Sequence, residues 1–402
     1  MGCRGAHKLF CSARTLALAS GAAVALLAAP AASASLSARD ITPFPPSKLI
    51  LGAVWTSPRY GPPANQWGDI LPTVWADDGD QYTIMDDGGT DAQIAGGLWR
   101  QSIAQITGVP PNIQFRHVGD PGTPPPHTYA QIHKDKSLWV GPLGAYYSSG
   151  LLAAGHVFYA TQQVDWDWSA NSSFGGLQGI AYSFDHGQHW QFANKAFPAP
   201  LGNLGWVIRG QGGHYQDGWV YAIATEREFN ASTMIMGRSR PDVADITNPA
   251  RWQWVSGWTT SSNGQLWPVY SSSVAGAVPV MSWGSHITYP QMAYDSPIHR
   301  YLLSFTYSYA AKPPGVWRGG AELVILEAPH PWGPFTFVAH ESKFGPSNGY
   351  APGFPLAWIS RNGHDLWLKW AANFDGCAAN LDCSAGYGFN YRRVHLSVAT
   401  GH

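Results

Sequence analysis

The chain has 402 residues, with 24 lysines and arginines against 25 aspartates and glutamates. A balance this even creates no basic field, so the sequence argues against nucleic acid and against an anionic membrane surface as partners. Aromatic residues make up 13% of the chain and charged residues only 12%. Some of these rings must fill a core, but an exposed tryptophan also has a flat apolar face that suits a sugar ring.

The first residues predict an export signal. A basic start is followed by an apolar run at residues 16–29, which is too short for a stable membrane span, and then by the cleavage pattern Ala-Ser-Ala at 32–34. We therefore predict a signal peptide at 1–34, with a retained anchor as the alternative. The mature chain, 35–402, is then a single secreted domain with no membrane span, and we expect it to be a monomer.

Two of the four cysteines, Cys3 and Cys11, lie in the predicted signal. The other two, Cys377 and Cys383, are predicted to form a disulfide that closes a small surface loop, because an exported chain meets an oxidising compartment. A zinc site would need two further ligands, and none lies nearby at a suitable spacing. We predict no metal or other cofactor in the site, although the Asp-rich loops could hold a structural calcium ion.

Short strands joined by turns recur along the chain, and helical periodicity is almost absent after the signal. The turns are rich in Gly, Asp, Asn or Pro, which favours hairpins. In chain order, the clearest predicted hairpins pair residues 74–76 with 81–85, 130–133 with 137–140, 291–294 with 300–305, and 356–360 with 365–370. The sequence therefore predicts an all-β fold.

Strands spread this evenly over the 368 residues left after the signal (402 − 34) predict a sandwich, a barrel or a propeller. The hairpins are too many for one sandwich. At roughly 50–70 residues for a four-stranded blade, the chain accommodates about five to seven blades. Five are preferred, because the segments 107–128 and 257–286 then fall between strands as loops. We predict a β-propeller with five blades, six or seven being the alternatives.

The sharpest local motif is Ser-Phe-Asp-His-Gly-Gln-His-Trp at residues 183–190, which matches the Asp-box pattern Ser-x-Asp-x-Gly-x-x-Trp. We expect a hairpin turn in which Asp185 accepts hydrogen bonds from backbone amides, Gly187 takes a positive φ and Trp190 packs beneath. The motif resembles that of sialidase-like propellers, in which the box is structural and lies away from the active face. It therefore indicates a fold and not a reaction.

Three further segments carry a resemblance to a family. Residues 71–79 (LPTVWADDG), 287–290 (ITYP) and 327–335 (EAPHPWGPF) resemble the bacterial proteins that contain domain of unknown function 4185, in the same order along the chain. The resemblance implies a propeller. Because some members are endo-acting glycoside hydrolases on furanose polysaccharides of actinobacterial cell walls, it also implies an arabinan as a candidate substrate. The chain departs from the family where a Tyr-Gly-Asp-Gly turn is common, since residues 85–88 read Met-Asp-Asp-Gly.

Glycoside hydrolysis needs two carboxyl groups across the bond that breaks, one as acid and one as base or nucleophile. Asp77 and Asp78 directly follow an apolar strand, and Asp86 and Asp87 end the next one. Carboxylates this close repel one another unless they are used or paired. We predict Asp77 or Asp78 as the base or nucleophile and Asp87 as a substrate contact. The alternative is that these carboxylates cap amides of their own turns.

Glu226 is the predicted general acid. It ends the strand predicted at 220–225, and Arg227 and Glu228 flank it, so its pKa could be tuned by its neighbours. A salt-bridged strand end at the surface is the alternative interpretation.

A sugar subsite is predicted where carboxylates and tryptophans alternate, at Asp165, Trp166, Asp167 and Trp168. The rings could lie beside a sugar while the carboxylates bind its hydroxyl groups. The predicted partner is therefore a polysaccharide or an oligosaccharide.

Two other functions stay open at this point. A polysaccharide lyase would use His or Tyr as base and acid and Arg to neutralise a uronate carboxylate, and His286, Tyr289 and Arg209 are its candidates. They are also candidate substrate contacts in the hydrolase. A non-catalytic carbohydrate-binding propeller would show tryptophans without two convergent carboxylates. A serine nucleophile is excluded, because the chain has no Gly-x-Ser-x-Gly elbow.

Overall fold

The computed structural model describes residues 42–90, 101–118, 145–164, 177–198, 201–213, 215, 217–308, 321–345, 349–372 and 386–400. All of them belong to one compact unit, Ala34–His402. The predicted signal peptide, the predicted disulfide and the predicted subsite at 165–168 lie outside the described residues, as does the side chain of Asp87. These remain predictions.

Strands make up almost all of the regular structure. The described helical segments are single turns: α3 (Val243–Ile246), η2 (Pro249–Arg251), η3 (Val274–Gly276) and η4 (Leu356–Trp358). None of the helices in the described part of the chain is long and apolar enough to cross a membrane. The predicted all-β class is confirmed.

The first two sheets follow the chain order. One contains β2 (Gln66–Asp69), β3 (Thr73–Trp75), β4 (Gln81–Thr90), β5 (Gln101–Val109) and β6 (Asn112–Val118). The other contains β7 (Ala145–Ala154), β8 (Val157–Val164), β9 (Leu177–Ser183) and β10 (Gln191–Phe192). In the second sheet each strand pairs antiparallel with the next, while in the first sheet β2 and β3 both pair antiparallel with β4, and β5 and β6 follow.

A nine-stranded sheet follows, and it has two antiparallel parts. The first part is β11 (Asn203–Arg209), β12 (Val220–Thr225), β13 (Ala231–Ser239), β14 (Gln253–Thr260) and β15 (Leu266–Ser271). The second part is β16 (Met281–Asp295), β17 (Arg300–Ser308), β18 (Ala321–Ala328) and β19 (Thr336–Glu341). The two parts meet where β11 pairs with β16 in parallel.

The last sheet joins the two ends of the described chain. It contains β20 (Tyr350–Gly353), β21 (Asp365–Ala371), β22 (Asn390–Val398) and β1 (Ile50–Trp55). The N-terminal strand β1 thus pairs with the C-terminal strand β22, from Ile50 opposite Val398 to Trp55 opposite Val394. This pairing closes the ring and covers a sheet edge that would otherwise be free to pair with another chain.

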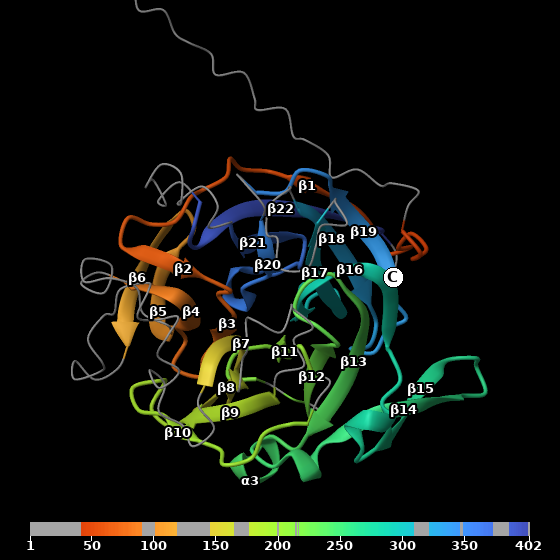
Figure 1. Ribbon diagram of the computed structural model, residues 1–402. Helices are drawn as coiled ribbons and strands as arrows, with labels where there is room; N and C mark the ends of the chain where they lie inside the picture. The colour runs from red at the N-terminus through yellow and green to blue at the C-terminus, as the bar shows by residue number, and fades with distance from the viewer. Residues whose placement is uncertain are drawn as a thin grey trace, which may run out of the picture. The chain divides into compact units, whose positions relative to one another are not determined.

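Figure 1 shows the sheets arranged around a common axis, with β3, β7, β11, β16 and β20 near the centre and β6, β10, β19 and β1 further out. This is the predicted β-propeller. If the parallel junction between β11 and β16 is taken as a blade boundary, the sheets divide into five blades. However, β13 also pairs with β16 across that junction, and the segments 107–128 and 257–286, predicted as loops, contain strands β6, β14 and β15. The count of five stays a prediction.

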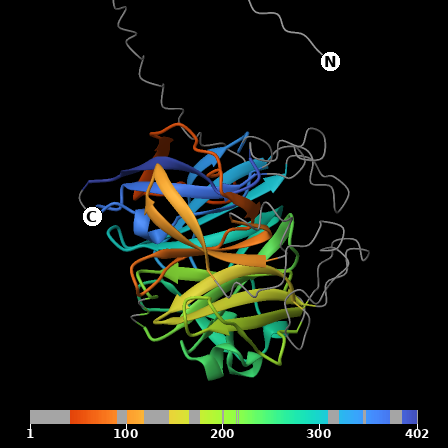
Figure 2. The same ribbon diagram turned by 90° about the vertical axis from the view of Figure 1, so that its left-hand side faces the viewer.

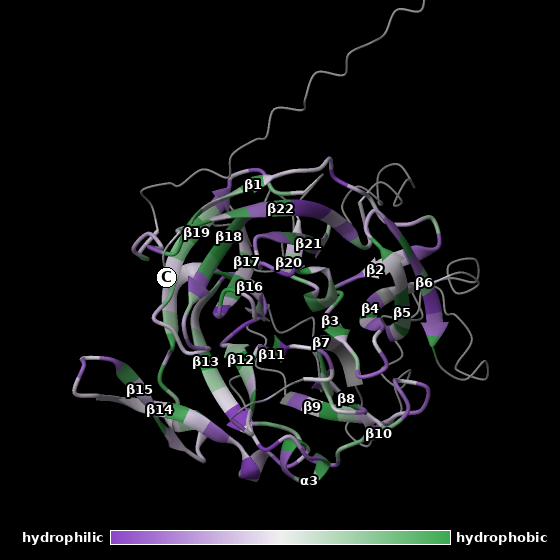
Figure 3. Cartoon of the chain, turned by 180° about the vertical axis from the view of Figure 1, so that it is seen from behind, coloured by the Kyte–Doolittle hydropathy of each residue, from purple (hydrophilic) through white to green (hydrophobic). Residues whose placement is uncertain are grey.

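Buried hydrophobic side chains of the described residues form five clusters. Four clusters take their members from two neighbouring blades, as where Ile84 of β4 packs with Phe158 of β8, and the remaining one also includes Tyr289 of β16. In Figure 3, β18 is mostly hydrophobic and the edge strand β6 mostly hydrophilic. The core therefore lies between the sheets. Polar side chains near the axis are not needed to fill it and can bind a ligand.

The parallel inner strands give the axis two distinct ends. We call the end where β11 and β16 begin the N-end, and the end where they finish the C-end. The end of β3 also lies at the C-end, because Gly212, which follows β11, donates its backbone N–H to the carbonyl oxygen of Trp75 at 2.8 Å. Figure 2, a view from the side, shows the strands running between the two ends.

Candidate active site

Two carboxyl groups and two tyrosines from four separate segments meet at the N-end. Asp69 ends β2, Glu228 lies in the turn between β12 and β13, Tyr289 lies in β16 and Tyr350 begins β20. The Tyr350 hydroxyl donates to Asp69 Oδ2 at 2.6 Å, and the Tyr289 hydroxyl donates to Glu228 Oε1. The two tyrosine rings lie with their centroids 6.0 Å apart. The tyrosine pair therefore links two carboxyl groups, one at each of its ends.

The surroundings of Glu228 favour its protonated form. Only 4% of the residue is exposed. Burial raises the pKa of the Glu228 carboxyl well above its ordinary value, and the negative charge of Asp69 raises it further, while a hydrogen bond from Gln163 acts in the opposite direction. A carboxylic acid that keeps its proton near neutral pH, beside a second carboxyl group, has the properties of a general acid.

A third carboxylate lies beside Asp69 in the sheet. Asp86 of β4 lies directly opposite Asp69 of β2, is completely buried and accepts a hydrogen bond from the backbone N–H of Ser148 at 3.0 Å. Directly opposed residues of an antiparallel pair share one face of the sheet.

The backbone around the cluster is strained. Ile70 and Leu71, which follow Asp69, have φ of 61° and 55°, Tyr289 has 46°, and Ala351, which follows Tyr350, has 49°. Left-handed backbone is uncommon for residues other than glycine, and for a β-branched residue such as Ile70 it is an outlier. Each such residue costs on the order of 1 kcal/mol or more and typically marks a functional site.

Glu226, the predicted acid, contacts the backbone of the following strand. Its carboxylate accepts the backbone N–H of Ser232, and also the backbone N–H and the hydroxyl of Thr233 at 2.9 and 2.8 Å. It therefore holds the β12–β13 turn in shape. The turn also presents Glu228, two residues later, to the cluster. The role of Glu226 as the acid stays a prediction.

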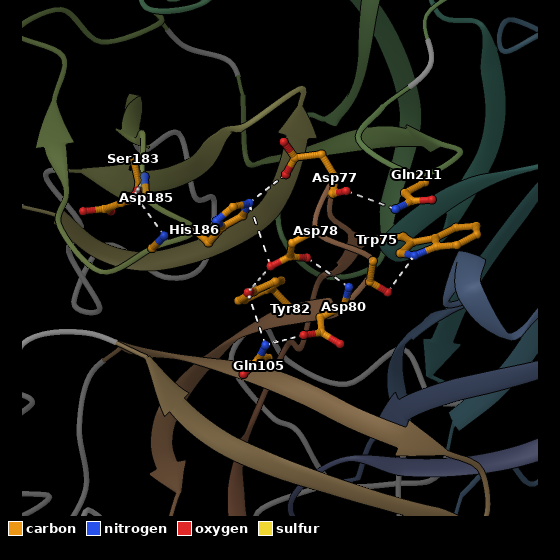
Figure 4. A network of polar contacts seen from close by, with 12 residues as sticks. Trp75, Asp77, Asp78, Asp80, Tyr82, Gln105, Ser183, Asp185, His186 and Gln211 are labelled. Carbon is orange, nitrogen blue, oxygen red and sulfur yellow. Dashed lines mark hydrogen bonds and ion pairs between the residues drawn. The ribbon is translucent and has the colours of Figure 1, made fainter.

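Asp77 and Asp78 lie at the C-end, in the turn between β3 and β4 (Figure 4). Asp77 Oδ1 is 2.7 Å from His186 Nε2, and this hydrogen bond lowers the pKa of the Asp77 carboxyl. Asp78 accepts the Tyr82 hydroxyl at 2.6 Å and the backbone N–H of Asp80 at 2.9 Å. These contacts fit the alternative interpretation, in which turn carboxylates serve the structure.

The structure therefore does not bring Asp77 or Asp78 close to Glu226, as the predicted pair of catalytic carboxyl groups would require. Asp77 lies beside the residues that follow β11, since Gln211 donates to its backbone carbonyl at 3.2 Å. Glu226 follows Thr225, which pairs with Asn203 at the start of β11. The seven residues of β11 span roughly 20 Å. Carboxyl groups at opposite ends of this strand are too far apart to act on one glycosidic bond.

The lyase candidates are also separated. Arg209 lies at the C-end, with Nη1 3.7 Å from Asp217 and its guanidinium 4.9 Å from the centre of the Tyr294 ring. His286 stacks on Trp283 with centroids 4.6 Å apart. Of the predicted histidine, tyrosine and arginine, Tyr289 alone contacts the carboxyl cluster among the described residues. Arg209 is not placed to neutralise a substrate bound there.

The segment 183–190 forms the turn between β9 and β10. Asp185 accepts the Ser183 hydroxyl at 2.8 Å and the backbone N–H of His189 at 2.9 Å, and Gly187 has a φ of 89°. Trp190 packs against a core cluster. The turn lies at the C-end, where its His186 contacts Asp77. A relation to sialidase-like proteins stays a prediction.

Among the described residues, no group of three or more His, Cys, Asp or Glu side chains is placed to hold a metal ion. Some of the Asp-rich loops lie outside the described ranges, so the structural calcium ion stays a prediction.

We expect Asp77→Asn to leave kcat within twofold of the parent, because its partners are structural. The carboxylate is 41% exposed, so the loss of stability should be only about 0–1 kcal/mol. That loss should vanish at low pH, because a group with a lowered pKa stabilises the fold only while it is ionised. Activity at pH 7, and thermal unfolding at pH 7 and at about pH 2, below the ordinary pKa of Asp, measure both. A loss of tenfold or more in kcat would return Asp77 to the catalytic machinery.

Another buried carboxyl group, that of Asp295, lies away from the cluster, at the C-end of β16. Burial raises the pKa of Asp295 to about 7, while a backbone N–H from Ile298 acts in the opposite direction. A raised folded-state pKa means that stability is present below about pH 4 and is lost as the pH rises towards 7. The loss is about 1.4 kcal/mol for each pKa unit.

Asp295→Asn should therefore raise the Tm at pH 8 and change it little at pH 4. Thermal unfolding at pH 4, 6 and 8 measures this, and each protein is its own control at pH 4. An equal change in Tm at all three values would show that the charge of Asp295 is not the cause.

The fold and the cluster together define a β-propeller with two carboxyl groups, the buried Glu228 and the partly buried Asp69, towards one end of its axis. No protein-family model matches the chain, and no curated protein matches it. Membership of the family with domain of unknown function 4185 thus stays a prediction.

Solved structures of similar fold do exist. A hydrolase candidate from Bacteroides ovatus aligns with a TM-score of 0.48 and 13% identity, over 85% of this chain and 90% of the other. An α-L-arabinofuranosidase from Podospora anserina, solved with cellotriose, aligns with 0.44 and 9%, over 84% and 95%. A GH43_1 enzyme from Xanthomonas citri aligns with 0.45 and 10%, over 85% and 93%. At these values the similarities carry no argument about family or substrate.

Proposed function

We propose that the chain is a secreted glycoside hydrolase in which Glu228 is the general acid and Asp69 is the base or nucleophile. The observation that carries the proposal is the buried Glu228 carboxyl, whose pKa is raised by burial and by the charge of Asp69. Two carboxyl groups with different environments are what glycosidic hydrolysis needs.

The roles follow from the contacts. Glu228 gives its proton to the oxygen of the leaving sugar as the glycosidic C–O bond breaks. The Asp69 carboxylate either removes a proton from the attacking water or forms a temporary bond to the anomeric carbon, which water then breaks. Tyr350 orients Asp69 through its 2.6 Å hydrogen bond, and Tyr289 orients Glu228. The net reaction adds one water molecule across the bond and requires no cofactor.

The proposed substrate is a polysaccharide, and an arabinan is the first candidate. This part rests on the sequence resemblance at 71–79, 287–290 and 327–335, and not on the site geometry. Export rests on the predicted signal peptide at 1–34. The aromatic composition, 13% of the chain, is compatible with a sugar-binding surface.

The test is a product assay against a panel of polysaccharides that includes arabinan and uronate-containing chains. Release of reducing ends should be measured together with the ultraviolet absorbance of unsaturated uronate. Reducing ends without that absorbance support hydrolysis. Absorbance that rises with the reducing ends indicates a lyase and overturns the two-carboxyl mechanism. Binding without any product indicates a carbohydrate-binding propeller and overturns it as well.

A further inference from the structure

A buried lysine lies next to the carboxyl cluster. Lys369 of β21 is 1% exposed. Its Nζ donates to the carbonyl oxygen of Ile70 at 3.2 Å and to that of Ala351 at 3.0 Å. Ile70 directly follows Asp69, and Ala351 directly follows Tyr350. One ammonium group therefore ties together the two backbone segments that carry the Asp69–Tyr350 hydrogen bond.

Both carbonyl groups belong to residues in left-handed backbone, with φ of 61° at Ile70 and 49° at Ala351. Such conformations persist only when the surroundings hold them. The ammonium group suits this task because it has three donors that rotate freely about one point. Gln291 donates to the same Ile70 carbonyl, at a longer distance of 3.5 Å.

Burial of this lysine is costly. Burial lowers the pKa of Lys369 well below its ordinary value, and no charged neighbour is among the causes of the shift. An apolar residue of similar length would fill the same space without the cost of removing an amine from water. General stability is therefore a poor explanation for a lysine at this position, and the hydrogen bonds to the two carbonyl groups are a better one.

We propose that Lys369 is a positioning residue for the active site, which holds the carbonyl groups of Ile70 and Ala351 so that Tyr350 keeps Asp69 in its reactive orientation. The inference rests on the proposed role of Asp69. It adds a residue that does not touch the substrate and acts only through the backbone of β2 and β20.

The test compares Lys369→Met with Ser304→Ala. Methionine has a similar length but no donor. Ser304 is buried too, and its hydroxyl donates to the carbonyl oxygen of Pro352 at 2.8 Å, one residue beyond Ala351. Ser304→Ala thus removes a hydrogen bond to the same strand without releasing either carbonyl that Lys369 holds. Both variants should be assayed well below their Tm.

Lys369→Met should lower kcat by about 10- to 100-fold and change KM by less than about threefold, because small displacements of a reacting group cost rate more than binding. The acid limb of the pH profile of kcat/KM, which the base sets, should move to higher pH as Tyr350 donates less well to Asp69. Ser304→Ala should change kcat less than twofold and leave the limb in place.

A folded Lys369→Met with the parent kcat and the parent acid limb would overturn the inference, as would an equal effect of Ser304→Ala. Should Lys369→Met not fold, Lys369→Gln takes its place. It keeps a donor and should have an intermediate kcat, and a parental kcat and limb would again overturn the inference. Glu228→Gln is run alongside: if it stays active, it is the proposed function that fails and not the role of Lys369 alone.

Discussion

Glu228→Gln is expected to lower kcat by about 10²- to 10⁴-fold, because glutamine has nearly the same shape but no proton to donate to the leaving sugar. The loss should be smaller for substrates with a good leaving group, such as nitrophenyl glycosides, since these need little protonation. Steady-state kinetics on both kinds of substrate measure it. Equal losses on both would show that Glu228 is not the acid.

Glu226→Gln is the matched control, with the same chemical change two residues away. It should keep kcat within about twofold and lose roughly 1 kcal/mol of stability, because an amide is a weaker acceptor for the Ser232 and Thr233 amides. If Glu226→Gln is inactive and Glu228→Gln is active, the prediction from the sequence is right and our assignment is wrong.

Glu228→Gln also tests the raised pKa of Glu228. A carboxyl whose folded-state pKa is raised contributes stability below about pH 4, and this stability is lost as the pH rises through the folded-state pKa. Glu228→Gln removes the carboxyl group whose ionisation destabilises the fold at higher pH. The Tm of the variant should therefore exceed that of the parent by an amount that grows as the pH rises.

Asp69→Asn is expected to lower kcat by about 10³-fold or more, because the water or the anomeric carbon loses its carboxylate partner. The residual activity should also have a changed pH profile. The charge of Asp69 helps to raise the pKa of Glu228, so its removal should move the basic limb of kcat/KM to lower pH. A pH series with Asp77→Asn as the control measures both effects.

The configuration of the parent's product separates the two roles of Asp69: retention indicates a nucleophile and inversion indicates a base. In either case a small anion such as azide should restore activity to Asp69→Asn by attacking the anomeric carbon directly, with inversion. Full activity in Asp69→Asn without any added anion would contradict both roles and leave the axis without a catalytic carboxylate.

The sequence by itself determined many of the described strands and turns and the fold class, although residues 356–358, predicted as part of a strand, form the helical turn η4. These depend on local physics: alternating apolar residues make half-buried strands, and Asp, Asn and Gly at the tips make hairpins. The turn after Trp75 and the turn at 183–190 lie where the local residues predict them. The predicted β-propeller follows from many short strands in even spacing, and closure by β1 and β22 is consistent with it.

The tertiary structure decided which carboxyl groups meet. Asp69 and Tyr350 are separated by 281 residues, and no local pattern reports their 2.6 Å contact. The choice between Glu226 and Glu228 depends on how one turn directs its side chains. The sequence does contain two signals of this site: Lys369 interrupts an apolar strand, and Asp69 directly precedes the apolar residues Ile70 and Leu71. Their meaning depends on the arrangement of blades around the axis, which brings the starts of inner strands together and places Asp77 at the other end.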